Sequence, residues 1–292
     1  MLILARFIMA SRARAALVAC AGNLLPLVSP AAVALVTLRK GWAEGLLVAL
    51  WAALPLVTML HVGGFSSMLM WASLLTVAVV MAAAGALRAT SSWQSALMVV
   101  VGASAAAALV AGELLTAEVL AFSDSLEEMF AQMRSAGSAL IWEATPSMVL
   151  GLLAWVMAVS ALGSLLLGRW WQALLYNPGG LGQELRALRL NPVLALGLIA
   201  GLLICQLGPT GYAAWGNLLG LPLVMNGIAL VHYLVAVSPK VGTHWLAVFY
   251  VSLVLLSGPL VLLLAGVGFV DALIDLRARI FRRPGDSPDG ES

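Results

Sequence analysis

The feature that most constrains this chain is a series of about eight apolar runs, most of them near the 20 or so residues that a helix needs to cross a bilayer. Charged residues, Pro or Gly separate the runs, which cover residues 15–38, 42–60, 65–87, 93–115, 144–168, 192–207, 212–237 and 244–269. Of the 292 residues, 62% are hydrophobic and 10% are charged, whereas soluble domains contain about 45–50% and about 25%. We therefore predict an all-α fold, a polytopic transmembrane helical bundle of about eight membrane segments.

Charge and cysteine content exclude other classes of protein. The formal net charge is +2, from 15 Lys and Arg against 13 Asp and Glu, which is too balanced for a nucleic-acid-binding protein. The two cysteines, Cys20 and Cys205, lie far apart in apolar runs and suit neither a disulfide framework nor a metal site. Arg12 and Arg14 interrupt the stretch before Cys20, so we expect a retained membrane segment there rather than a lipid anchor.

Three polar regions divide the predicted architecture. Residues 1–276 form the transmembrane domain, which contains an acidic segment at 113–143 and a basic connector at 169–191. In the acidic segment, Leu126, Met129, Phe130 and Met133 recur at helical spacing, which predicts an amphipathic surface helix. Residues 277–292 form a polar C-terminal tail.

The first run has two possible arrangements. If every run crosses once, Lys and Arg are almost equally divided between the two sides, and the rule that cytoplasmic loops are basic is not met. If Pro26 and Pro30 break the first run so that it returns to its own side, most cations lie inside and the acidic segment lies outside. That second arrangement, which we favour, places the basic C-terminal tail outside.

Four stretches carry a resemblance to a known family. They are 30–41 (PAAVALVTLRKG), 185–192 (LRALRLNP), 227–233 (GIALVHY) and 268–277 (GFVDALIDLR). Together they resemble the YybS-like family of bacterial integral membrane proteins, which implies an inner-membrane protein of about eight helices with no established reaction. More distantly, the segment that ends in Leu38-Arg39-Lys40-Gly41 is similar to the second helix of the vitamin-binding S components of energy-coupling-factor transporters.

Motifs for catalysis are missing from the sequence. It has no HExxH, GxSxG, P-loop or paired CxxC motif, so we expect neither enzymatic activity nor a cofactor. Asp271 and Asp275 match half of the metal motif of CDP-alcohol phosphotransferases, but the other half is absent. Ion pairs with Arg277 and Arg279 on the same helix are the more ordinary interpretation of these carboxylates.

Polar residues inside the apolar runs are the better indication of a site, because an unpaired polar group is costly in lipid. They are Asn23, Asn217, Asn226, His232 and Tyr233. One interpretation is the lining of a cavity for a small ligand, and the other is hydrogen bonding between packed helices. We favour helix packing, because no run carries a carboxylate near its middle that could act as a partner.

These observations leave two hypotheses for function. The first is a membrane-embedded partner or scaffold protein that binds through charged loop residues, namely Glu127, Glu128, Arg186, Arg189, Asp271 and Asp275. The second is a small-molecule-binding or transport protein that resembles the S components. In both, the lipid bilayer is the main partner, and close spacings of small residues (Gly41/Gly45, Gly197/Gly201, Gly216/Gly220, Ala103/Ala107) allow contact with another membrane protein or a second copy.

Overall fold

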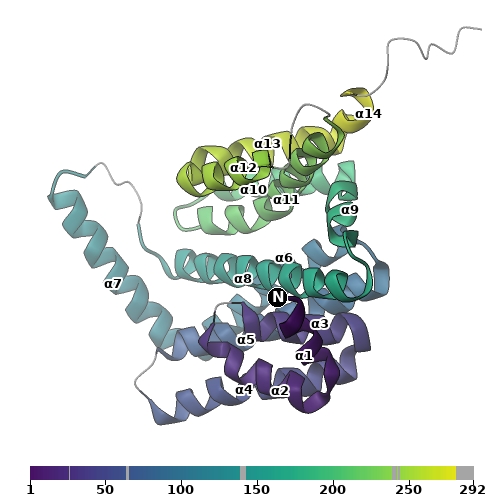
Figure 1. Ribbon diagram of the computed structural model, residues 1–292. Helices are drawn as coiled ribbons and strands as arrows, with labels where there is room; N and C mark the ends of the chain where they lie inside the picture. Colours follow the sequence, from purple (N-terminus) through teal and green to yellow (C-terminus); the bar gives the residue numbers. More distant parts are fainter. Residues whose placement is uncertain (26, 64–65, 139–142, 239–241, 243, 281–292) are drawn as a thin grey trace, which may run out of the picture. The chain divides into compact units, whose positions relative to one another are not determined.

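The computed structural model describes residues 1–25, 27–63, 66–138, 143–238, 242 and 244–280 (Figure 1). These residues form helices and no strands, which confirms the all-α prediction. The elements are α1 (Leu2–Ala10), α2 (Arg12–Ala21), the 3₁₀ turn η1 (Gly22–Leu24), α3 (Val28–Lys40), α4 (Trp42–Val62), α5 (Ser67–Thr90), α6 (Trp93–Leu114), α7 (Thr116–Ser135), α8 (Pro146–Tyr176), α9 (Gly180–Ala187), α10 (Pro192–Leu207), α11 (Ala213–Val237), α12 (His244–Leu255), α13 (Ser257–Ile274) and α14 (Leu276–Ile280).

Among the described residues, six helices are long and apolar enough to cross a membrane, namely α4, α5, α6, α8, α11 and α13. The pair α9 and α10, bent by 76°, is a seventh candidate. These helices are those of a multi-pass membrane protein, and six or seven candidates in the described part of the chain fit the approximate prediction of about eight segments. The difference in number arises mainly at the first run, which is not one continuous helix.

The first run is broken, as the arrangement with the returning segment predicts. Helix α2 ends at Ala21 and α3 begins at Val28, while Pro26 itself lies outside the described residues. The Arg12 guanidinium, at the start of α2, pairs with Glu44 at the start of α4, which directly follows α3 in the chain. The α2–α3 segment therefore enters and leaves at the same end of α4, as a re-entrant segment does.

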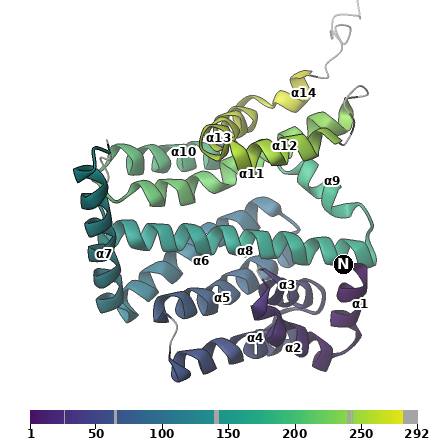
Figure 2. The same ribbon diagram turned by 60° about the vertical axis from the view of Figure 1, so that its left-hand side comes forward.

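The chain divides into two compact units, and the division falls within α10 and α11. Unit 1 comprises Met1–Leu181 and Gly201–Leu219, and unit 2 comprises Gly182–Ala200 and Gly220–Ser292. In unit 1, the short helix α3 packs against α4, α5 and α8 and lies between α4 and α8 in Figure 2. Its apolar side chains are buried on every side, because Gly168 of α8 lets the α3 backbone approach closely.

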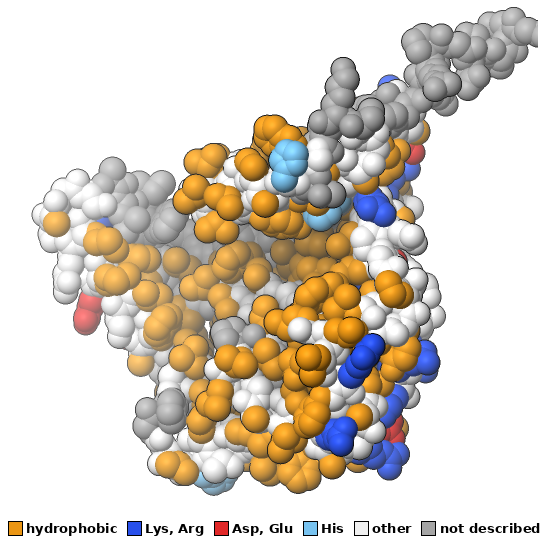
Figure 3. Space-filling view, viewed as in Figure 1, with side chains coloured by type: hydrophobic (Ala, Val, Ile, Leu, Met, Phe, Trp, Pro, Cys, Tyr) orange, Lys and Arg blue, Asp and Glu red, His pale blue; other side chains and the backbone are white. Residues whose placement is uncertain are grey.

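The two ends of unit 1 differ in charge. Around the start of α4, Arg12 and Lys40 surround Glu44, and Arg88 donates to the Leu38 carbonyl from Nη1 (2.8 Å). Lys and Arg gather along this edge in Figure 3, whereas Asp and Glu residues lie on α7. Helix α7 runs across the ends of α6 and α8 (Figure 2). A 22-residue helix such as α6 therefore separates a basic end from an acidic end.

In unit 2, α11 and α13 are in close backbone contact. A Cβ on Gly268 would lie 2.1 Å from the Leu223 carbonyl oxygen, and one on Gly227 would lie 2.2 Å from that of Leu264. The predicted run at 244–269 is divided at Leu256, where α12 ends and α13 begins, and α13 continues to Ile274. The predicted run ends at residue 269, before Asp271. Because α13 continues to Ile274, Asp271 lies inside a candidate membrane-spanning helix.

Candidate functional sites

A buried ion pair lies at the end of α13 in unit 2. Asp271 is fully buried, and its Oδ2 accepts from Arg277 Nε (3.1 Å) and lies 3.0 Å from Arg277 Nη2. The fully buried Asn226 of α11 donates from Nδ2 to the Gly268 carbonyl (2.7 Å) and to Asp271 Oδ2 (3.4 Å). All of these donors approach the same oxygen, so the structure shows no hydrogen bond to Asp271 Oδ1.

The basic connector is fastened to the same place. Arg189 donates from Nε to the Asp271 carbonyl and from Nη2 to that of Ala272 (both 3.2 Å), and Nη1 lies 3.0 Å from Asp275 Oδ2. Arg277 Nη1 donates to the Arg186 carbonyl (2.6 Å). Arg189 thus binds carbonyls in the last turn of α13, and Arg277 binds a carbonyl in the last turn of α9. Arg186, Arg189, Asp271 and Asp275, predicted as a partner-binding surface, thus come together in one intramolecular network.

This network corrects two expectations. Asn226 does have a carboxylate partner, although it lies in the last turn of α13 rather than near the middle of a run, because α13 extends past the predicted end of its run and Asp271 faces α11. The start of the polar tail lies beside the connector, through Arg277 and the Arg186 carbonyl, rather than on the other side. The physical reason is the break at Leu256, since 244–269 does not form one straight crossing helix. Residues 281–292 of the predicted tail lie outside the described residues.

The five polar residues predicted inside the runs have separate partners. Asn23 donates from Nδ2 to the carbonyls of Ala19, Cys20 and Ala52, so it satisfies backbone at the broken first run. His232 Nε2 lies 2.8 Å from the Tyr250 hydroxyl, and the Arg277 guanidinium lies 5.6 Å from the centre of the Tyr233 ring. Helix packing accounts for these contacts, whereas Asn217 lines a cavity.

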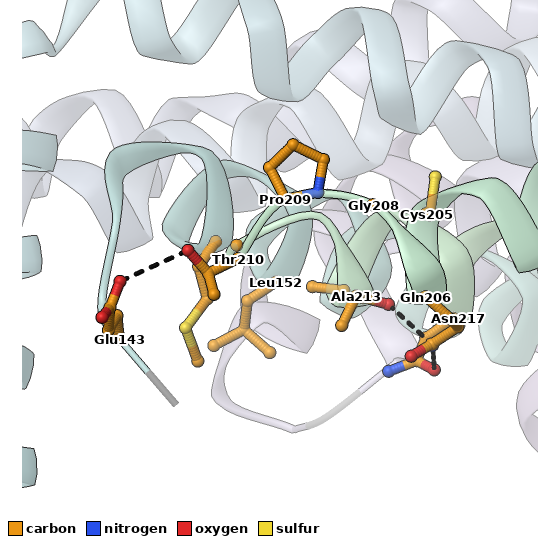
Figure 4. A pocket seen from close by; sticks show the side chains of 12 residues that line it. Glu143, Leu152, Cys205, Gln206, Gly208, Pro209, Thr210, Ala213 and Asn217 are labelled. Atoms are coloured by element: carbon orange, nitrogen blue, oxygen red, sulfur yellow. Dashed lines mark hydrogen bonds between the residues drawn. The ribbon is translucent and has the colours of Figure 1, made fainter. Parts of the chain in front are cut away.

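The cavity lies in unit 1, where the start of α8 meets the hairpin between α10 and α11 (Figure 4). Its volume is about 440 Å³. Gln206 Nε2 donates to the Ala213 carbonyl (3.2 Å) and to Asn217 Oδ1 (3.5 Å), and the Thr210 hydroxyl donates to Glu143 Oε2 (3.3 Å). The lining comprises Glu143, Met148, Leu152, Cys205, Gln206, Gly208, Pro209, Thr210, Gly211, Ala213, Ala214 and Asn217.

Of this lining, sequence reasoning predicted only Asn217 as a candidate site residue. The remaining polar residues, Gln206 and Thr210, flank the Gly208-Pro209 pair, which is a turn signal between two apolar helices. Polar residues on both sides of such a turn could have indicated a polar site at the end of the hairpin. Glu143 could not be found in this way, because it belongs to a distant loop.

The acidic helix α7 is amphipathic, as predicted, and it is anchored at one side. Val119, Ser123 and Phe130 are buried on one face, and the Ser123 hydroxyl donates to the Ala144 carbonyl (3.2 Å). Glu127 accepts from the Ala144 backbone N–H (2.8 Å) and from Arg134. These two hydrogen bonds lower the pKa of Glu127 below its ordinary value. Glu127, predicted as part of a partner surface, therefore holds a loop in place.

The other acidic side chains of α7 are exposed. Asp124 and Glu128 are four residues apart and therefore lie on one face, which points away from the buried stripe. Glu118, nearer the start of α7, is also exposed. Phe122, Met129 and Met133 form a second exposed stripe, which is apolar. The helix therefore presents an apolar face and an acidic face in addition to the face that packs on the bundle.

Comparison with known proteins gives no relative for this chain: neither a family model, nor a curated protein, nor a solved structure matches it.

Proposed function

We propose that this chain is a multi-pass protein of the bacterial inner membrane that acts as a docking protein, whose acidic helix α7 binds a Lys/Arg-rich segment of a partner protein. The proposed location in a bacterial inner membrane rests on the resemblance of four stretches to the YybS-like family. The docking role rests on one observation, the exposed acidic face of a helix that is hydrogen-bonded to Ala144 through Ser123 and Glu127.

The position of α7 supports this role. Helices that carry an exposed apolar stripe and a charged face lie in the plane of the bilayer surface, with the stripe in the headgroup layer. The stripe of Phe122, Met129 and Met133 has this character, and α7 crosses the ends of membrane-spanning helices. Asp124 and Glu128 then face water, where a partner can reach them.

Charge determines the kind of partner. An acidic face at a membrane surface is repelled by anionic lipid headgroups, and complementary charge steers oppositely charged proteins to it. A segment rich in Lys and Arg is therefore the partner that fits α7. The buried network around Asp271 supports a structural rather than a transport role for the polar residues of unit 2, because they contact one another.

The proposal is tested by a photo-crosslinking residue at Ser125, an exposed position whose hydroxyl bonds only within its own helix. The charge-reversed variant Asp124→Lys/Glu128→Lys should lose the adduct, whereas reversal of Lys40 at the basic end should retain it. In nanodiscs, a lysine-rich peptide should bind the wild-type protein in a salt-dependent manner and the reversed variant more weakly. Equal binding of the peptide by both proteins would refute the proposal. Glu127 is left unchanged, because it anchors the loop.

A second candidate function, small-molecule binding or transport as in the S components, is favoured by the re-entrant α2–α3 segment. Broken helices that end inside the bilayer form substrate sites in many transporters. Thermal unfolding of the purified protein against a panel of vitamins and metabolites tests this candidate, because a ligand that binds the folded state raises its stability.

A further inference from the structure

The cavity between α8 and the α10–α11 hairpin has the size and rigidity of a small-molecule site. Its volume of about 440 Å³ lies in the range of about 300–1,000 Å³ that is usual for ligand pockets. Trp215 Nε1 donates to the Ser147 carbonyl (2.9 Å), and the Trp215 ring covers Gly151, so the start of α11 is pinned to α8. The walls are therefore fixed by contacts other than those of the lining.

The charge of the lining favours a cation. Glu143 is the only carboxylate among the described lining residues, and none of them is Lys or Arg. In the described structure, Glu143 accepts a hydrogen bond from the neutral Thr210 hydroxyl and forms no ion pair.

The rest of the lining is divided between apolar and polar contacts. Met148 and Leu152 of α8 and Pro209 provide an apolar wall, and Figure 4 shows Glu143 and Thr210 at one end of it. At the other end, Gln206 Nε2 donates a hydrogen bond to Asn217 Oδ1. Gln206 Oε1 and Asn217 Nδ2 are then left for a ligand. An amphipathic molecule could place its apolar part against the apolar wall and its polar groups against the polar side chains at the ends of the cavity.

We propose that this cavity binds the primary ammonium group of a small amphipathic amine, with the ammonium on the Glu143 carboxylate and the apolar body on Met148 and Leu152. Two sources share this chemistry: a free amine, and the headgroup of phosphatidylethanolamine in the surrounding bilayer. The site is independent of partner docking on α7, so either proposal can fail alone.

The test compares two probes of nearly equal shape, 2-phenylethylamine and 2-phenylethanol, by thermal unfolding of the detergent-purified protein at neutral pH. The amine should raise the midpoint in a concentration-dependent manner and the alcohol should not. The variant Glu143→Gln should bind the amine roughly tenfold more weakly or worse, because a charge-assisted hydrogen bond is replaced by a neutral one. Glu113→Gln, at an exposed position near the end of α6, should behave as the wild-type protein.

Further arms separate the two sources and keep the test independent of folding. If the lipid is the ligand, nanodiscs of phosphatidylethanolamine should stabilise the wild-type protein more than those of phosphatidylcholine, and Glu143→Gln should remove the difference. Leu152→Trp fills the cavity without changing charge and should abolish either response. Equal shifts with amine and alcohol, or amine and lipid responses that survive in Glu143→Gln, would overturn the proposal, as would the absence of any ammonium-dependent shift in the wild-type protein.

Discussion

Replacement of Asp271 by Asn tests the buried network of unit 2 most severely. The exchange keeps the size of the side chain and removes its charge, so the Arg277 guanidinium, whose side chain is 9% exposed, is left without a counter-charge. Removal of one partner of a buried ion pair costs about 3–5 kcal/mol. Two contacts of Arg277 survive, the hydrogen bond to the Arg186 carbonyl and the contact with the Tyr233 ring. We therefore expect a loss of about 3 kcal/mol, at the lower end of that range.

The assay is reversible unfolding by SDS in mixed micelles, with the free energy of unfolding compared between variants. Glu44→Gln is the matched control, because Glu44 also pairs with an arginine but at an exposed place, and the expected change is small. The double variant Asp271→Leu/Arg277→Met removes both charges and should be more stable than Asp271→Asn. If Asp271→Asn loses no more stability than Glu44→Gln, the buried ion pair does not hold α13 and the connector together.

Three other comparisons have expected outcomes. Asn226→Ala should cost about 1–3 kcal/mol, because buried groups lose their partners, whereas Asn217→Ala should leave the midpoint of unfolding almost unchanged; equal effects would contradict the contacts described. Gly268→Ala should destabilise by about 1–3 kcal/mol through overpacking, while Gly266→Ala, which meets nothing within 4 Å, should be tolerated in the same unfolding assay. The lowered pKa of Glu127 means that its loop anchor is present above the ordinary value of 4.5 and is lost as the pH falls through the folded-state pKa. The protection factors of the α7 amides, which correct for the intrinsic exchange rate at each pH, should therefore fall at acidic pH in the wild-type protein and be low at every pH in Glu127→Gln.

The sequence predicts the spanning helices well, because length and apolarity are local properties. It predicts breaks less well, since proline alone does not decide them. Pro55 and Pro222 lie inside α4 and α11 without ending either helix, whereas the helices are interrupted between Ala21 and Val28 and again at Leu256. Pro259 follows the second break and sits in the first turn of α13, where its missing N–H has no cost, so a local signal was present.

The candidate sites depend on contacts that no local pattern contains. Asn226 and Asp271 are 45 residues apart, and their pairing requires the close approach of Gly227 and Gly268. Each residue stands out as polar in an apolar region, which is why the sequence singles out both. It could not show that they meet, nor that Glu143 reaches Thr210 across 67 residues.

The most direct test of the account is the sidedness of α6, a 22-residue helix with the basic end of unit 1 at its start and α7 after its end. In a variant without Cys20 and Cys205, single cysteines are placed at Ser91 and Ser125, which are both exposed, and labelled with a membrane-impermeant maleimide. We predict that only one of the two positions reacts in spheroplasts and that the other reacts only after the membrane is permeabilised. Reaction of both positions from the same side, or recovery of the protein in the soluble fraction without detergent, would contradict a chain that spans the bilayer with its acidic and basic ends on opposite faces.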